Sequence, residues 1–291
     1  RPGTNDESTP SVRCTCPLCR VDTDTHTGDM TSSLLTSQAG AHVHLVDMLG
    51  ATVSVGTDDR FGEGGNIWSA VVRLAAFMET SDVQLPDTRI LELGSGTGVL
   101  ALACAAKGAH VVATDAPWVM ELLCLNAEIA GNQRQIAAMG GSLLTAALLW
   151  GADGDIDCEK LKGKGGEGEF DVVCACECVY AMEGGSLGEI FGHSPENTSA
   201  LLMHTLERTC GAKTRLFIAN RMRSESGVLE MAFVRELVRV FDVINLQMTA
   251  KGEAGEVVYF GKITSVADVD RLEGSVSLGD VLVMECVRKK V

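Results

Sequence analysis

The segment Leu91–Gly98, with the sequence LELGSGTG, restricts the fold of this 291-residue chain more than any other segment. The short apolar run Arg89–Leu93 predicts a buried strand, and the Ala/Leu-rich run from Val99 to Lys107 predicts a helix. Three glycines fall in the turn between them: Gly94, Gly96 and Gly98. Glycine permits a sharp backbone turn there, and the absent Cβ atoms let a ligand approach the unpaired N–H groups at the helix start. The segment therefore predicts a strand–turn–helix unit that binds a ligand in its turn.

The rest of the chain continues this alternation of strand and helix. Further strands are expected at residues 110–114, 170–176, 215–219 and 241–246, and further helices at 117–130, 197–209 and 228–240. The apolar run 142–149 fits either type. Such alternation predicts an α/β, Rossmann-like, mostly parallel sheet with helices on both faces. Two more strand candidates, 257–263 and 280–287, remain near the end of the chain, and one of them is expected to form an antiparallel edge.

The domain prediction is a tail followed by one domain. Residues 1–40 are rich in Thr, Ser, Asp, Gly and Pro and are predicted to be disordered, and residues 41–291 to form a single domain. This domain begins with an extension, a hairpin over His42–Val55 and a helix over Ile67–Met78. Two Gly-containing insertions, near 151–169 and 183–196, are predicted to be loops.

Composition limits the partners and the compartment. With 24 basic and 39 acidic residues the net charge is −15, which disfavours binding to nucleic acid or to a membrane surface, and no apolar run is long enough to span a bilayer. Five of the eleven cysteines lie in apolar stretches, which indicates reduced thiols and a cytoplasmic, or also nuclear, protein. We expect a monomer. No metal site is predicted, although Cys14, Cys16, Cys19 and His26 leave zinc binding open.

The spacing of the loop indicates which ligand it binds. Dinucleotide-binding loops have the pattern G-x-G-x-x-G, whereas this one is G-x-G-x-G, preceded by Glu92. Asp115 stands 21 residues after Gly94, at the end of the second strand, where a carboxylate can accept both hydroxyl groups of a ribose. Asp115 is alternatively the N-cap of the helix that begins near Pro117. Because no pyrophosphate has to be enclosed, the loop favours S-adenosylmethionine over NAD.

These motifs resemble the class I, seven-β-strand, S-adenosylmethionine-dependent methyltransferases. NIWSA around Trp68, LLWG around Trp150 and CECVY at 176–180 further resemble the small protein-lysine methyltransferases that modify chaperones, elongation factors and other non-histone proteins. The resemblance implies a seven-stranded sheet and a Trp150 ring against the adenine. The predicted cofactor-binding residues are Trp68, Glu92, Gly94, Ser95, Gly96, Gly98, Asp115, Trp150 and Cys176.

The same resemblance indicates catalytic residues after the fourth strand. The family pattern there is Asp-x-x-Tyr, and this chain has Glu177-Cys178-Val179-Tyr180. A lysine nucleophile must be neutral although its ordinary pKa is about 10.4. Glu177 is therefore predicted to position the amine first and to act as general base second, and Tyr180 to hydrogen-bond the amine or shape its channel. Arg221 and Arg223, after the fifth strand, are interpreted as solvated loop charges, and the alternative is that they face the substrate mouth.

The sequence thus predicts a methyltransferase that uses S-adenosylmethionine, yields S-adenosylhomocysteine, and methylates a lysine presented by a protein. One alternative is transfer to histidine, to a protein N-terminus or to a small amine. Another is a non-catalytic cofactor-binding module, favoured by Glu177 in place of the family's Asp and by Cys176 in place of a smaller residue.

Overall fold

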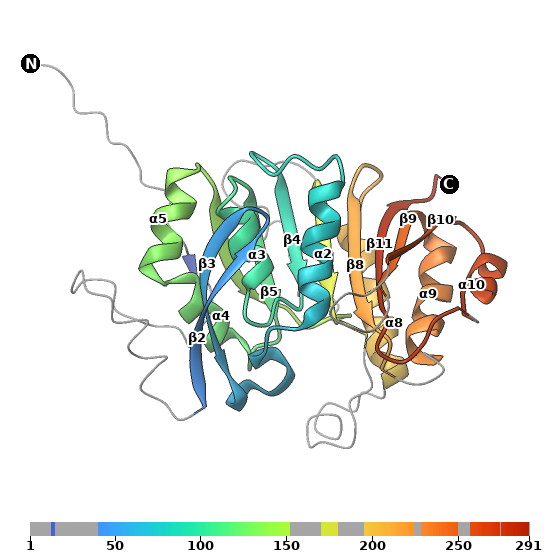
Figure 1. Cartoon of the computed structure of the whole chain (residues 1–291), viewed down its shortest axis with the longest axis horizontal. Helices are drawn as coiled ribbons and strands as arrows, with labels where there is room; N and C mark the ends of the chain where they lie inside the picture. The colour runs from blue at the N-terminus through green and yellow to red at the C-terminus, as the bar shows by residue number, and fades with distance from the viewer. Residues whose placement is uncertain are drawn as a thin grey trace, which may run out of the picture.

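One large, mostly parallel sheet organises the molecule in the computed structural model, which describes residues 13–14, 40–151, 170–179, 195–223, 228–249, 257–273 and 275–290 (Figure 1). In spatial order its strands are β1 (Arg13–Cys14), β6 (Ser142–Ala147), β5 (His110–Asp115), β4 (Arg89–Leu93), β7 (Val172–Cys176), β8 (Arg215–Arg221), β11 (Val281–Arg288), β9 (Phe241–Thr249) and β10 (Val257–Ile263). The strands from β6 to β8 pair in parallel, whereas β11 is antiparallel to both of its neighbours.

This architecture confirms the predicted fold class. The sheet contains two more strands than the expected seven, because the two-residue β1 and the antiparallel β10 are added at its edges. Of the two late strand candidates, β10 forms the antiparallel edge, and β11 inserts between β8 and β9. The sequence of β11 is apolar except for Glu285 and Arg288, and its first six residues are buried, as expected of a strand covered on both faces.

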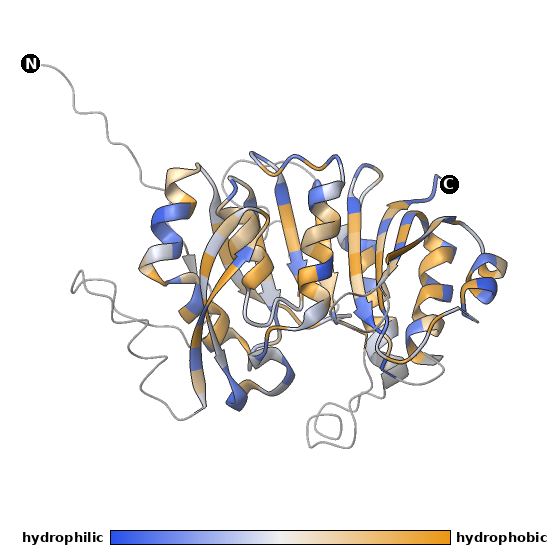
Figure 2. Ribbon diagram, in the orientation of Figure 1, coloured by the Kyte–Doolittle hydropathy of each residue, from blue (hydrophilic) through white to orange (hydrophobic). Residues whose placement is uncertain are grey.

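Helices cover both faces of the sheet. They are η1 (Asp59–Gly65), α2 (Ser69–Thr80), α3 (Val99–Ala105), α4 (Met120–Ala127), α5 (Ala130–Ala138), α8 (Pro195–Thr209), α9 (Val228–Val240) and α10 (Val266–Glu273). Successive residues of β4 show the two layers: Ile90 packs with α2 and α3, and Leu91 with α8 and α9. Figure 2 shows apolar residues concentrated on the strands and on the helix sides that face them.

One helix prediction was wrong in extent, and two helices were missed. The helix expected over 117–130 is shorter, since α4 ends at Ala127, and Gly131 lies inside a second helix, α5, instead of terminating the first. Neither α5 nor α10 was predicted from the sequence. In α5 only Asn132 and Ile136 are buried, so the apolar periodicity that identifies an amphipathic helix is almost absent.

The expected N-terminal hairpin is confirmed as a separate two-stranded antiparallel sheet, β2 (Ala41–Met48) and β3 (Ala51–Asp58). The buried Asn126 of α4 connects it to the glycine loop. Its side-chain amide donates to the carbonyls of Gly56 and Thr97, both at 2.9 Å, and its Oδ1 accepts the Gly56 N–H at 2.7 Å. The extension therefore supports the loop directly.

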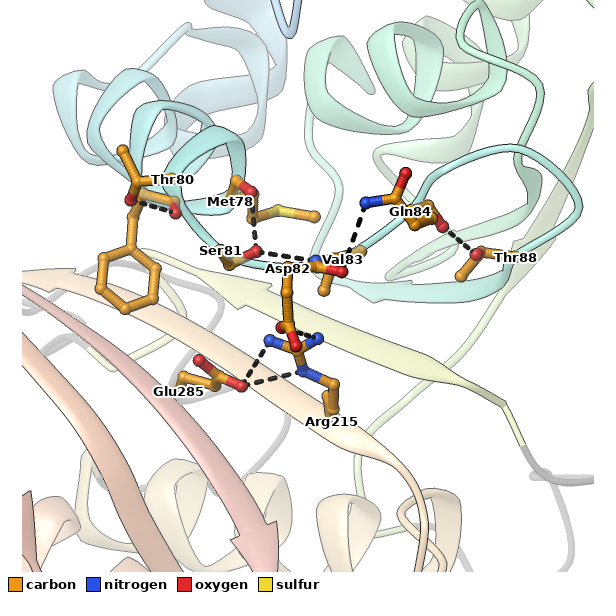
Figure 3. A network of polar contacts seen from close by, with 10 residues as sticks. Met78, Thr80, Ser81, Asp82, Val83, Gln84, Thr88, Arg215 and Glu285 are labelled. Carbon is orange, nitrogen blue, oxygen red and sulfur yellow. Dashed lines mark hydrogen bonds and ion pairs between the residues drawn. The ribbon is translucent and has the colours of Figure 1, made fainter.

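A polar network stabilises the edge of the sheet at which the parallel strands begin, away from their carboxyl ends (Figure 3). Arg215 at the start of β8 pairs with Asp82 in the connection after α2, at 2.6 Å, and with the buried Glu285 of β11, at 2.6 Å. Its guanidinium group also lies 5.4 Å from the ring centroid of Phe217. This network joins α2, β8 and β11, and leaves the carboxyl ends of the strands to form the site.

Three of the predicted regions lie largely outside the described residues: the tail, apart from 13–14 and Gly40, and the insertions near 151–169 and 183–196. None of the helices in the described ranges has the length and apolar content that a membrane crossing requires. Every cysteine whose side chain is described is a free thiol.

Candidate cofactor and acceptor site

The glycine loop after β4 has the backbone geometry that the sequence predicted. Gly94, Gly96 and Gly98 have φ angles of +65°, +53° and +75°, a region that side-chain-bearing residues rarely adopt. A Cβ on Gly94 would lie 2.8 Å from Cys178 Sγ, and one on Gly98 would lie 2.5 Å from Leu123 Cδ1. A Cβ on Gly96 would lie 3.1 Å from the carbonyl oxygen of Gly64 in η1. Both conformation and space therefore require glycine at these positions.

Asp115, at the end of β5, holds the loop from the side. Its Oδ2 accepts the Gly96 N–H at 2.6 Å and its Oδ1 accepts the Ala116 N–H at 2.7 Å. The Ser95 N–H donates to the Thr114 carbonyl at 2.9 Å, so two successive loop residues are tied to β5. Asp115 is not an N-cap, since α4 begins at Met120. Each carboxylate oxygen keeps a further lone pair for an incoming hydroxyl group.

Two acids beneath and beside the loop are poorly solvated. Glu92 of β4 is buried, and its carboxylate accepts the Ala101 N–H of α3 at 3.1 Å. Burial raises the pKa of Glu92 to about 8, and the nearby charge of Asp115 adds to the shift. Burial also raises the pKa of Asp115 to about 6. Glu92 therefore anchors the start of α3, whereas Asp115 borders the turn itself.

Trp150 and the end of β7 form the neighbouring wall. Trp150 is half-buried in the turn after β6, and its Cζ2 lies 3.2 Å from the position that a Gly94 Cβ would take. Cys176 is the half-buried last residue of β7, and burial raises the pKa of its thiol well above the ordinary value. Cys178 donates from Sγ to the Leu93 carbonyl at 3.3 Å, which closes the gap between the ends of β4 and β7.

Glu177 follows immediately, in an unusual conformation. Its φ of +55° is one of only three positive values among the described non-glycine residues, and its N–H donates to the Ala219 carbonyl of β8 at 2.8 Å. A non-glycine residue with such a φ angle is strained, and residues of this kind cluster at active sites and ligand clamps. The buried carboxylate accepts from Arg223 Nη2 at 2.8 Å through Oε2. Its Oε1 is also buried and has no hydrogen-bond partner among the described residues.

Trp68 completes this side of the site from the start of α2. The Arg223 guanidinium lies 5.0 Å and that of Arg221 5.7 Å from the Trp68 ring, and the Trp68 Nε1–H donates to the Glu63 carbonyl at 2.9 Å. The interpretation of Arg223 as a solvated loop charge was wrong. Its side chain is 24% exposed and pairs with Glu177. The sequence signal was available, because β7 and β8 are adjacent parallel strands whose ends meet.

The structure thus brings together every predicted cofactor residue and Glu177. Tyr180 lies outside the described residues, as do Cys16, Cys19 and His26, while Cys14 lies in β1, where only its backbone is described. Among the described residues no group of three or more His, Cys, Asp and Glu side chains could hold a metal ion.

The parallel sheet, the left-handed glycine turn and the acid on the next strand define a Rossmann-like protein, and folds of this class bind ligands at the carboxyl edge of the sheet. A family model described as "Lysine methyltransferase" matches residues 50–238. The chain belongs to the lysine methyltransferase family, and its cofactor is S-adenosylmethionine. The loop fits this group, since three missing Cβ atoms leave a concave turn and Asp115 has free lone pairs for the ribose.

Individual relatives are similar over roughly the same region. EEF1A lysine methyltransferase 3 of Mus musculus is 29% identical over 182 residues, which cover 62% of this chain and 66% of that protein. Protein N-lysine methyltransferase METTL21A of Danio rerio is 29% identical over 185 residues, covering 63% and 71%. Among solved structures, a magnesium protoporphyrin IX methyltransferase from Synechocystis with bound SAM has 17% identity and a TM-score of 0.42, covering 76% of this chain and 77% of that one.

Proposed function

We propose that this chain transfers the methyl group of S-adenosylmethionine to the side-chain amine of a lysine in a protein. One observation carries the proposal: a buried carboxylate, Glu177, lies at the end of β7, directly beside the end of β4 from which the glycine loop departs. Cofactor loop and amine-binding acid are thus on adjacent parallel strands. The names of the relatives, which are protein-lysine methyltransferases, agree with this substrate class.

The chemistry requires alignment more than activation. The bond between sulfur and the methyl carbon breaks with its electron pair going to sulfur, while the amine lone pair forms the new bond between nitrogen and carbon. The amine must lose a proton first, because an ammonium group has no lone pair. The carboxylate of Glu177 can accept a hydrogen bond from the amine through Oε1 and so direct its lone pair toward the methyl group. A second hydrogen bond from Tyr180 stays a prediction from the sequence.

We further propose that the chain acts as a monomer in the cytoplasm, or also in the nucleus, and does not bind nucleic acid or membranes. The net charge of −15 and the free thiols of the described cysteines support this setting.

The test is transfer of isotopically labelled methyl groups from S-adenosylmethionine to lysate proteins, followed by mass spectrometry of the modified residues. We expect the label on lysine Nζ. Label on histidine, on a protein N-terminus or on a small amine would replace the proposed substrate class. Cofactor binding without transfer to any lysate component would favour a non-catalytic module.

A further inference from the structure

Only one of the two carboxylate oxygens of Glu177 accepts a hydrogen bond from the described residues. Oε2 accepts from Arg223, whereas Oε1 is buried without a donor among the described residues. A buried acceptor without a donor is energetically costly, so such an atom indicates a missing partner. Under the proposed function, on which this inference rests, the acceptor amine of the substrate is that partner.

Arg223 is a fixed cation, held from three elements. Its guanidinium group donates to Glu177 at the end of β7 and lies over the ring of Trp68 at the start of α2. Its backbone N–H donates to Oε1 of the buried Glu230, in the first turn of α9, at 2.9 Å. Because Trp68 is itself fixed by the carbonyl of Glu63, the positive charge has a defined place beside the carboxylate.

This cation resolves a conflict in the chemistry. A lone carboxylate beside the acceptor would stabilise the ammonium form of the lysine, which cannot accept a methyl group. A guanidinium group paired with the carboxylate cancels its charge and leaves Oε1 as a hydrogen-bond acceptor. Arg221, over the same Trp68 ring, adds a second positive charge nearby.

We propose that Arg223 is a positioning residue that makes the bound lysine neutral: it compensates the charge of Glu177, so that the carboxylate orients the amine without retaining its proton. The proton leaves to water before methyl transfer. Arg223 acts through Glu177 and needs no contact with the cofactor.

Other ionisable groups surround the same position, and their effect has to be separated from that of Arg223. They are Glu230 of α9, Arg221 of β8, Cys176 of β7, Cys178 after it, Glu92 of β4 and Asp115 of β5. All of them are unchanged in an Arg223 variant. A difference between the pH profiles of wild type and variant therefore reports Arg223 itself.

The experiment compares wild type with Arg223→Gln and Arg223→Lys between pH 6.5 and pH 9.5. The probe is lysate protein with tritiated S-adenosylmethionine, and the readout is the initial rate of methyllysine formation, recovered by acid hydrolysis, at several lysate concentrations. The rate of wild type should rise with pH as the lysine loses its proton. In Arg223→Gln we expect this rise to occur about one pH unit higher, so the rate falls about tenfold at pH 7 and recovers toward pH 9.5. The apparent KM should fall, because the ammonium form binds the uncompensated carboxylate. In Arg223→Lys, which keeps the positive charge, the rate should rise at the same pH as in wild type.

Several outcomes separate the alternatives. A loss of rate that is equal at every pH, or a raised apparent KM, would show a merely structural role for Arg223 and overturn the inference. Arg239→Gln, which breaks an exposed pair on α9, is the matched control and should leave the profile unchanged. Calorimetry should show unaltered cofactor binding in the Arg223 variants, and a lost cofactor site would also count against the proposal. A wild-type chain that forms no methyllysine would overturn the proposed function, and this inference with it.

Discussion

The two halves of the site are built by different means. The cofactor half, at the ends of β4 and β5, consists mostly of backbone: three glycines with positive φ angles, a helix start and one acid only 19 residues from the N–H it accepts. The acceptor half, at the ends of β7 and β8, consists of side chains, with Glu177 and Arg223 separated by 46 residues and joined over Trp68. Local sequence specifies the first half, and only the sheet topology assembles the second. The two halves should therefore fail independently when mutated.

The largest effect is expected from filling the cofactor half. In Gly96→Arg the left-handed backbone is strained, and a Cβ would lie 3.1 Å from the Gly64 carbonyl oxygen. We expect a loss of S-adenosylmethionine affinity of at least about a hundredfold, which corresponds to about 2.7 kcal/mol, by calorimetry. Gly131→Arg is the matched control, since nothing lies near that glycine and it is exposed. Equal affinity in both variants would remove the loop from the cofactor site.

The next largest effect separates the halves. Glu177→Ala should keep cofactor affinity within about twofold, yet lower the rate of methyllysine formation by about a hundredfold or more, because the amine loses its orienting acceptor. Glu177→Asp restores the acid of the family pattern and should retain more activity than the Ala variant. Full activity of Glu177→Ala would exclude Glu177 from the mechanism.

The third prediction concerns Glu92, which lies beneath the loop and should make the stability of the fold depend on pH. The pKa of Glu92 is raised to about 8 in the folded state, so the folded chain binds a proton that the unfolded chain releases near pH 4.5. Stability from this group is present at low pH and is lost as the pH rises from about 4.5 to 8. Relative to Glu92→Gln, the melting temperature of wild type should fall by roughly several degrees between pH 5 and pH 8. As a control, Glu236→Gln changes an exposed residue, and its melting temperature should depend on pH as that of wild type does. If the melting temperatures of wild type and Glu92→Gln changed equally between pH 5 and pH 8, the prediction for Glu92 would be refuted.

The smallest effect is expected from the second arginine of the acceptor half. Arg221 lies over Trp68 at 5.7 Å, and no described contact joins its guanidinium group to Glu177. Arg221→Gln should move the rising limb of the rate profile in the same direction as Arg223→Gln, by roughly a few tenths of a pH unit. A shift larger than that of Arg223→Gln would reverse the assigned importance of the two residues.

The same contrast explains what could be predicted from the sequence. The left-handed turn of the glycine loop, the place of Asp115 at the end of β5 and most strands are encoded in short runs of residues, and these structural predictions were confirmed. The position of β11 between β8 and β9 depends on pairing between distant segments, which a local pattern does not contain. The helix α5 was missed because its packing side holds a buried Asn132 instead of a row of apolar residues.

The acceptor half shows most clearly what could not be predicted from the sequence. The prediction that Glu177 is a site residue came from a motif, but its positive φ angle and its pair with Arg223 result from tertiary contacts. The surrounding hydrogen bonds, including that from the Glu177 N–H to the Ala219 carbonyl, offset the backbone strain at Glu177. A place for Arg223 at the substrate mouth was the alternative interpretation of the sequence, but its pair with Glu177 could have been predicted only from the strand order together with the two strand ends.

The most direct measurement is a crystal structure of the chain with S-adenosylhomocysteine. We expect the ribose on Asp115, the adenine against Trp150, and the sulfur at the gap between the ends of β4 and β7, facing Glu177. A nucleoside bound elsewhere, or a sulfur directed away from Glu177, would contradict this expectation.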